Sequence, residues 1–160
     1  MRIVRTAEAH APAMAAVHAQ AFDKSWREDE FEDLMEGAGI YGFLADGGSE
    51  PMGVILCRVA AGEMEILTVG VAPAQRRNGV AQALIAAALP VAHELGAESV
   101  FLEVAIDNPG AITLYERSGF VRAGLRKSYY DRGPAGVMDA LVMRLDLAPR
   151  APYPGSGEME

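Results

Sequence analysis

Arg76-Arg77-Asn78-Gly79-Val80-Ala81 is the stretch of this 160-residue chain from which the fold can be read. It follows residues 63–71, a β-branched run that predicts a strand, and it leads into an alanine- and leucine-rich run that predicts a helix from Val80 onward. The first turn of a helix has unpaired backbone N–H groups and partial positive charge, and a glycine lets a phosphate come close to them. With its two arginines, the stretch therefore predicts a site for a diphosphate-bearing cofactor.

The amino-acid sequence of this loop does not match either of two common nucleotide-binding motifs. The loop lacks the Gly-Lys-Ser/Thr of the P-loop and the three glycines of the dinucleotide fingerprint. An ordinary glycine-containing loop with solvated arginines stays open as the alternative. The position of the loop between a strand and a helix favours phosphate binding.

Hydrophobic periodicity and turn residues predict the elements on both sides of the loop. A three-stranded meander comes first, then a strand–helix–strand crossover, then a closing hairpin. This order predicts an α+β fold with a mixed, mostly antiparallel central sheet of about seven strands and helices on both faces. Ser25 is the expected N-cap of the second helix, with Glu28 three residues later. The expected strands are residues 2–5, 40–45, 51–60, 63–71, 99–104, 120–125 and 137–145, and the expected helices are residues 7–22, 25–36, 80–95 and 109–118.

The bulk composition bounds the class of protein and its partners. We expect one domain over residues 1–147 and a flexible tail over residues 148–160, which is rich in proline and glycine. The formal net charge of −8 argues against direct nucleic-acid binding, which needs a basic surface. An acidic surface would suit a basic partner, and solubility explains it equally well.

Cysteine, histidine and long apolar runs give further expectations. The single cysteine, Cys57, lies in an apolar run, so we expect a buried structural thiol and no disulfide. His10 and His18 are eight residues apart, a spacing that does not make a metal pair, and we expect no metal. The chain opens without a signal-peptide pattern, and no run approaches the 18 or so apolar residues of a membrane span. We therefore expect a cytoplasmic protein without a membrane partner.

Three blocks of the sequence together resemble one enzyme superfamily. Arg76-x-x-Gly79-x-Ala81 resembles the pyrophosphate loop of the GNAT acetyltransferases, and Asn108 and the run Leu114-Tyr115-Glu116-Arg117-Ser118-Gly119-Phe120 follow at suitable spacing. Within that superfamily the RimI branch resembles the chain over residues 1–147. The residues that carry this closer match are Leu102-Glu103-Val104, Tyr129-Tyr130, Asp139-Ala140-Leu141-Val142-Met143 and, in altered order, Ser25-Trp26-Arg27-Glu28. Ala81 departs from the glycine that many members have at that position.

The resemblance implies acetyl-CoA as co-substrate and a role for each matching position. Glu103 would be the general base and Tyr115 the general acid that protonates the departing thiolate. Asn108 would help to hold the cofactor arm, and its place before Pro109 independently predicts an N-cap or turn residue. The backbone of Val69, Gly70 and Val71 would hold the acetyl and pantetheine portion, and Arg76, Arg77, Asn78, Gly79, Val80, Ala81 and Gln82 would form the pyrophosphate loop. RimI enzymes acetylate the N-terminal amine of a small-subunit ribosomal protein, and some act more widely.

The chemistry of the two proposed catalytic side chains is consistent with these roles. A peptide α-amine has a pKa of about 7.7–8.0, so roughly a tenth or more of it is neutral at pH 7, whereas a lysine amine has a pKa of about 10.4. Glu103 can take the proton of such an amine, and strand alternation puts it on one face with Phe101. A solvated strand carboxylate is the alternative for Glu103, and a tyrosine packed on the core is the alternative for Tyr115. Tyr129 and Tyr130 could line a peptide groove or simply pack.

Three functions remain open at this point. The first is acetylation of a protein or peptide N-terminus, one with basic character, by a monomer or weak homodimer. The second is a GNAT enzyme for a small amine such as a polyamine, an amino acid or a drug. The third is a non-catalytic regulator that binds acyl-CoA. A fold alone does not choose between these substrates.

Overall fold

The computed structural model describes residues 1–131, 134 and 136–149, with the side chains of 130 and 131 left out. Within these residues seven strands form one sheet in the order β1-β2-β3-β4-β5-β7-β6, and every neighbouring pair is antiparallel except β4 and β5. The strands are β1 (Arg2–Arg5), β2 (Ile40–Asp46), β3 (Pro51–Ala60), β4 (Glu63–Val71), β5 (Ser99–Ala105), β6 (Val121–Asp131) and β7 (Val137–Asp146). The helices are α1 (Ala11–Ala21), α2 (Glu28–Met35), α3 (Val80–Glu94) and α4 (Pro109–Arg117), with 3₁₀ turns η1 (Glu8–His10) and η2 (Pro73–Gln75).

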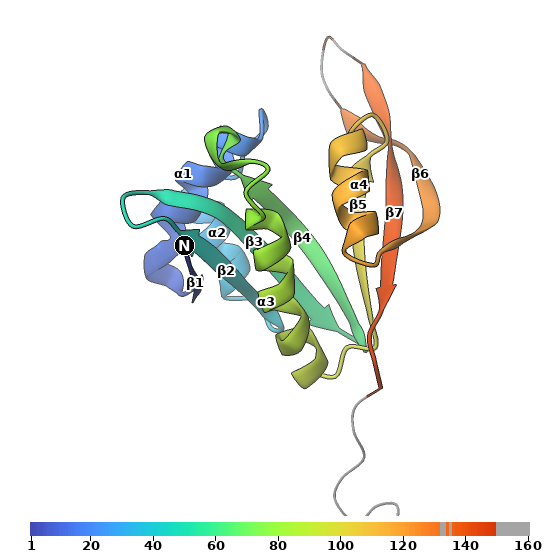
Figure 1. Ribbon diagram of the computed structural model, residues 1–160, viewed down its shortest axis with the longest axis horizontal. Helices are drawn as coiled ribbons and strands as arrows, with labels where there is room; N and C mark the ends of the chain where they lie inside the picture. The colour runs from blue at the N-terminus through green and yellow to red at the C-terminus, as the bar shows by residue number, and fades with distance from the viewer. Residues whose placement is uncertain (132–133, 135, 150–160) are drawn as a thin grey trace, which may run out of the picture.

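The sheet is covered by helices on both faces, as predicted (Figure 1). On β3, a strand buried on both sides, side chains alternate between two hydrophobic clusters. Val54 and Leu56 belong to the cluster with α1 and α2, whereas Ile55 and Cys57 belong to the cluster with α3. The strand directions and the two layers of helices confirm the α+β fold with a mostly antiparallel sheet, and Cys57 is a buried thiol, as predicted.

β4 and β5 pair over a short distance and then separate. Their ladder has three pairs, of which Glu65↔Phe101 is the last along the chain. Figure 1 shows the two strands diverging beyond this point, so that the sheet opens into a V. The register between β3 and β4 shifts at Leu67, and such a bulge increases the local twist of the strand. Residues 66–71 therefore present an edge of β4 that no described residue of β5 pairs.

The ends of some elements differ from the prediction. The second helix begins at Glu28 with Arg27 as its N-cap, so the expected cap at Ser25 is wrong. The Arg27 amide donates to Glu30 Oε1 at 3.2 Å, and the Trp26 amide is already held by His18 Nδ1 at 3.0 Å. The last two strands are also longer than predicted, β6 by the largest margin.

Two further predictions concern the C-terminal tail and membrane-spanning helices. The expected tail at 148–160 lies outside the described residues except for Ala148 and Pro149, and His93 Nε2 lies 3.1 Å from the carbonyl oxygen of Ala148. Among the described helices, none combines the length and apolar character that a bilayer crossing requires.

Candidate active site

Gly79 is the N-cap of α3, at the start of the helix where the sequence predicts phosphate binding. Its φ of 75° is left-handed, and as the N-cap it contributes no side-chain hydrogen bond. The first i to i−4 bond of the helix runs from the Ala83 amide to the Gly79 carbonyl, so helix geometry leaves the amides of residues 80–82 pointing outward. A Cβ built on Gly79 would meet only Gln82 Oε1, at 4.0 Å. A Cβ at this N-cap would therefore be in open space, and phosphate binding by this loop stays a prediction.

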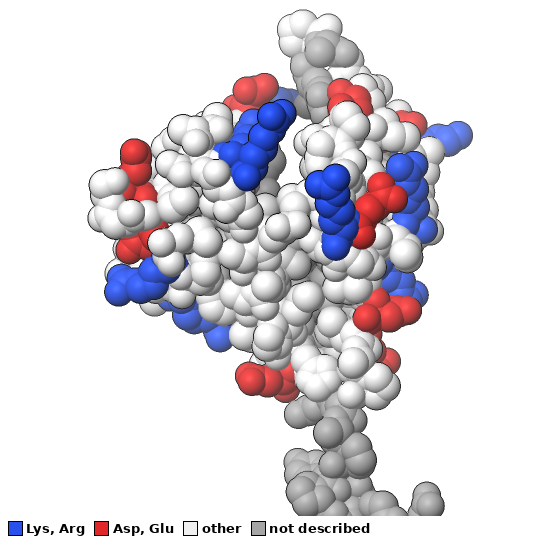
Figure 2. Space-filling model, viewed as in Figure 1, with Lys and Arg blue, Asp and Glu red and all other residues white. Residues whose placement is uncertain are grey.

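The two arginines of the loop, Arg76 and Arg77, are both exposed. Arg76 Nε donates to the carbonyl of Val71 at 3.3 Å, which ties the loop to the end of β4. Arg77 has a left-handed φ of 68°. Figure 2 shows few charged side chains over α3, with basic side chains beside the indentation that separates the parts of this face over α3 and α4. Positive charge therefore lies close to the helix N-terminus.

The predicted pantetheine-binding residues lie on the unpaired edge of β4. Val69, Gly70 and Val71 all follow Glu65, the last β4 residue paired with β5. A Cβ on Gly70 would come within 2.7 Å of Phe22 Cε2 and 3.0 Å of Ala21 Cβ. The glycine thus allows the end of α1 to pack directly on this part of β4.

Asn108 and Tyr115 lie on α4. Asn108 is the N-cap, and its Oδ1 accepts from the Ala111 amide at 3.2 Å, so the predicted capping role is confirmed. Tyr115 is 8% exposed and belongs to the core cluster, with its ring at 6.1 Å from that of Phe120. Packing accounts for the Tyr115 ring, while the acid role of its hydroxyl stays a prediction.

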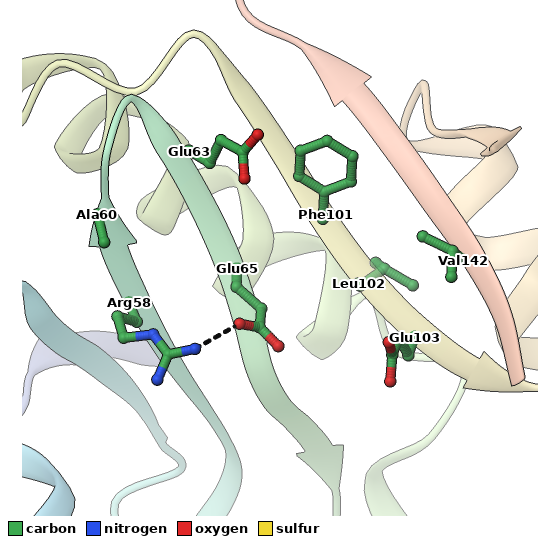
Figure 3. Close-up of a pocket in the computed structure, with 8 residues that line it drawn as sticks. All are labelled: Arg58, Ala60, Glu63, Glu65, Phe101, Leu102, Glu103 and Val142. Atoms are coloured by element: carbon green, nitrogen blue, oxygen red, sulfur yellow. Dashed lines mark hydrogen bonds and ion pairs between the residues drawn. The ribbon is translucent and has the colours of Figure 1, made fainter. Parts of the chain in front are cut away.

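Glu103 lies on β5 two residues beyond the last pair with β4, at the point where the V opens. Its side chain is 24% exposed and is on the same face as Phe101, opposite to Leu102 and the α3 cluster. Glu63, Glu65 and Glu103 line one pocket, in which Glu65 is turned toward Arg58 (Figure 3). This pocket has a volume of about 310 Å³ and is lined by Arg58, Ala60, Glu63, Glu65, Phe101, Leu102, Glu103 and Val142.

Two residues lie beside Glu103 in the structure. The sequence offers no reason to single out Arg126, and it leaves Tyr129 open between lining a groove and packing. Arg126 Nη1 donates to Glu103 Oε1 at 2.9 Å, and the Arg126 guanidinium lies 4.1 Å from the centre of the Tyr129 ring. Burial raises the pKa of Tyr129, and the neighbouring Glu103 carboxylate raises that pKa further. Tyr129 is thus part of the same site, whereas the side chain of Tyr130 lies outside the described part. No signal in the sequence joins Arg126 to Glu103, because β7 lies between their strands.

The described residues hold no group of three or more His, Cys, Asp or Glu side chains arranged to bind a metal. The site as described consists of a helix N-terminus, an open strand edge, a carboxylate at the opening of the V and a buried tyrosine. Such a set can bind a phosphorylated thioester and accept a proton.

Comparison with known proteins places the chain among acetyltransferases. The model of the acetyltransferase (GNAT) family matches residues 5–120. The ribosomal protein bS18-alanine N-acetyltransferase of Escherichia coli is 27% identical over 137 residues, which are 86% of this chain and 91% of that enzyme. The crystal structure of the E. coli ribosomal-protein-alanine N-acetyltransferase superposes with a TM-score of 0.84 at 25% identity, covering 96% of this chain and 97% of the other.

Two mycobacterial relatives are more similar over a shorter stretch. The N-alpha-acetyltransferase RimI of Mycobacterium tuberculosis is 40% identical over 84 residues, which are 52% of this chain and 49% of that protein. An uncharacterized protein of Mycobacterium leprae is 44% identical over 82 residues, which are 51% of this chain and 21% of that protein. The chain thus spans less than half the length of either relative.

Proposed function

The chain belongs to the acetyltransferase (GNAT) family, and we propose that it transfers the acetyl group of acetyl-CoA to the N-terminal α-amine of a protein. A small-subunit ribosomal protein is the proposed substrate class, and the cytoplasm is the proposed location. The similarity to the E. coli enzyme over 86% of this chain supports the choice. The proposal rests above all on one observation: the Glu103 carboxylate lies where β4 and β5 separate, beside the edge that can accept the thioester.

The described residues fit acetyl-CoA along one continuous path. The amides of residues 80–82 and the Arg77 cation suit the pyrophosphate. The unpaired edge at Val69, Gly70 and Val71 offers backbone donors and acceptors to the amides of the pantetheine arm. When bound, acetyl-CoA supplies an acetyl thioester carbonyl at the far end of this arm.

Glu103 and Tyr115 have opposite proton-transfer roles in this proposal. The acceptor amine forms the new C–N bond, and its proton passes to an oxygen of Glu103, directly or through a water molecule. The C–S bond breaks, and the Tyr115 hydroxyl donates its proton to the sulfur that leaves. Since an α-amine has a pKa of about 7.7–8.0, Glu103 needs to remove a proton that is already weakly held.

The charge of the pocket supports a basic acceptor peptide. Glu63, Glu65 and Glu103 line one pocket, and the whole chain has a formal net charge of −8. Complementary charge speeds the encounter of such partners. Arg58 lines the pocket and pairs with Glu65 at 2.8 Å, and Arg126 pairs with Glu103 at 2.9 Å, so both arginines can also donate to the carbonyl groups of a peptide near these carboxylates.

Transfer of labelled acetyl from acetyl-CoA to three acceptors tests this proposal. The acceptors are a peptide with the N-terminus of the small-subunit ribosomal protein, an N-terminally blocked peptide with lysine, and a polyamine. We expect transfer to the free N-terminus alone, with kcat lower by about 100-fold or more in Glu103→Gln and in Tyr115→Phe. Glu116→Gln removes another carboxylate paired with a β6 arginine and should leave kcat unchanged.

The other outcomes separate the alternatives. Transfer only to the polyamine would retain the family mechanism and reject the N-terminal substrate. Binding of acetyl-CoA without transfer to any of the three amines would favour a regulator that binds acyl-CoA. Unchanged kcat in Glu103→Gln would reject that residue as the base.

A further inference from the structure

The carboxylate of Glu103 already has a cationic partner. Arg126, on β6, reaches past β7 and donates from Nη1 to Glu103 Oε1 at 2.9 Å. The Arg126 side chain is 57% exposed and that of Glu103 is 24% exposed. An arginine has several N–H donors in a planar fork, so one of them can bind Glu103 while others stay available to a ligand.

The position of Arg126 is fixed by an irregular segment of β6. Arg126 pairs with Ala140 and Tyr130 with Met138, so β6 has two more residues than β7 between these pairs. Ser128 within this segment has a left-handed φ of 54°, and its amide donates to Asp139 Oδ1 at 2.7 Å. The Tyr129 ring lies under the guanidinium at 4.1 Å. This ring contact is a second partner of the guanidinium besides Glu103, and it can hold the guanidinium in place when a ligand reaches the carboxylate.

An opposite-charge pair of this kind matches the chemistry of a peptide N-terminus. In a peptide the α-amine is two bonds away from the carbonyl carbon of the same residue, so a hydrogen-bond acceptor, the carbonyl oxygen, lies beside the amine. A carboxylate can take the amine while the adjacent guanidinium donates to that carbonyl oxygen. A simple alkylamine or a lysine side chain has no such oxygen, and it meets only the competing positive charge of the arginine.

We propose that Arg126 is a specificity-determining residue that donates to the first carbonyl oxygen of the acceptor while Glu103 holds its amine. This inference rests on the proposed role of Glu103 in acetyl transfer. Arg126 then favours N-termini because it stabilises an acceptor with the carbonyl and repels one without it. Its role is in binding the acceptor, so it affects KM for the acceptor more than kcat.

Two matched acceptors and three variants test this role. The acceptors are a peptide with N-terminal alanine and the same peptide with its first peptide bond replaced by an alkene, which keeps the amine and removes the carbonyl. Arg126→Met removes the donors and the charge but keeps the apolar stem, and Arg126→Lys keeps the charge. Arg122→Met is the control, since Arg122 is on the same strand, is 63% exposed and pairs with Glu116 at 3.7 Å.

The proposal predicts that loss of Arg126 raises KM for the peptide and does not raise KM for the alkene analogue. In Arg126→Met, KM should rise about tenfold for the peptide, the loss expected for a hydrogen bond from a charged donor, and should stay the same or fall for the alkene analogue. Arg126→Lys should recover part of the peptide affinity, and Arg122→Met should match the native protein with both acceptors. Equal shifts of KM for both acceptors in Arg126→Met would overturn the role of Arg126 and leave the proposed function intact. Absence of transfer from the native protein to the peptide would instead reject the proposed function, and this inference with it.

Discussion

The imidazole of His18 joins three parts of the fold, with Nε2 at 3.0 Å from the hydroxyl oxygen of Thr68 on β4. Its Nδ1 accepts a hydrogen bond from the Trp26 amide at 3.0 Å, so Nδ1 has no proton and Nε2–H is the donor to Thr68. The ring is 2% exposed and stacks on Trp26 at 5.0 Å between centres. Burial lowers the pKa of His18 to about 4, although Glu30 acts in the opposite direction.

Stability should therefore decrease in weakly acidic solution. In the unfolded chain His18 gains a proton near pH 6.5, whereas in the folded protein it stays neutral down to about pH 4. The unfolded state binds more protons between these values, so the free energy of unfolding falls as pH falls from about 6.5 to about 4. At about 1.4 kcal/mol per pKa unit, the loss reaches about 3 kcal/mol by pH 4. Urea unfolding at pH 7.5, 6.0 and 4.5 measures it.

The variant His18→Asn separates this effect from the protonation of carboxylates. An asparagine oxygen can still accept from the Trp26 amide, but the side chain does not titrate. We expect this variant to be less stable than the native protein at pH 7.5 and to lose less stability between pH 6.5 and 5. An equally steep loss in the variant would assign the pH dependence to acidic groups instead.

The thiol of Cys57 should be inert in the folded protein. The side chain is fully buried in β3, and burial raises the pKa of the thiol to about 12. Since the thiolate is the reactive form, a disulfide reagent at pH 8 should react only when the chain opens. The rate of this reaction should therefore rise with urea concentration as the unfolded fraction rises. In full denaturant one thiol per chain should react. Rapid reaction of the native protein in buffer would contradict the burial of β3.

Asn108 allows a test of whether its cap and its predicted cofactor contact are separate roles. Asn108→Ala removes the bond to the Ala111 amide and should lower the free energy of unfolding by about 1 kcal/mol. Asn108→Asp keeps a capping oxygen and should restore stability. If Asn108 also contacts the cofactor, Asn108→Asp should still raise KM for acetyl-CoA. Recovery of both stability and KM in the aspartate variant would limit Asn108 to capping.

The elements that sequence predicts well are those with local signals. The bounds of β3 and β4 agree with the prediction, because Ala61 and Gly62 make a turn between two apolar runs. Asn108 before a proline is likewise a local cap signal, which the structure confirms. The predicted cofactor loop also lies between a strand and a helix, as expected.

The features that sequence misses depend on contacts between distant residues. The N-cap of α2 is Arg27 and not Ser25, because His18, eight residues before Trp26, holds the Trp26 amide. Arg126 reaches Glu103 across 23 residues of sequence, and only the order of β5, β7 and β6 brings them together. The opening between β4 and β5 arises because their ladder ends at Glu65 and Phe101. No single residue in the sequence predicts where that ladder ends.

Gly79 gives the most direct test of the phosphate site. Its φ of 75° costs a residue with a Cβ about 1–2 kcal/mol, although a Cβ there would meet no atom closer than 4.0 Å. Gly79→Ala should therefore fold but reorient the amides of residues 80–82, and KM for acetyl-CoA should rise about tenfold. Gly96 is the matched control, because it has a φ of 89° at the other end of α3 and no atom within 4 Å of its Cβ position. Gly96→Ala should lower stability by a similar amount and leave KM for acetyl-CoA unchanged. If both variants raise that KM equally, the effect comes from the stability of α3, and the loop amides do not bind the pyrophosphate.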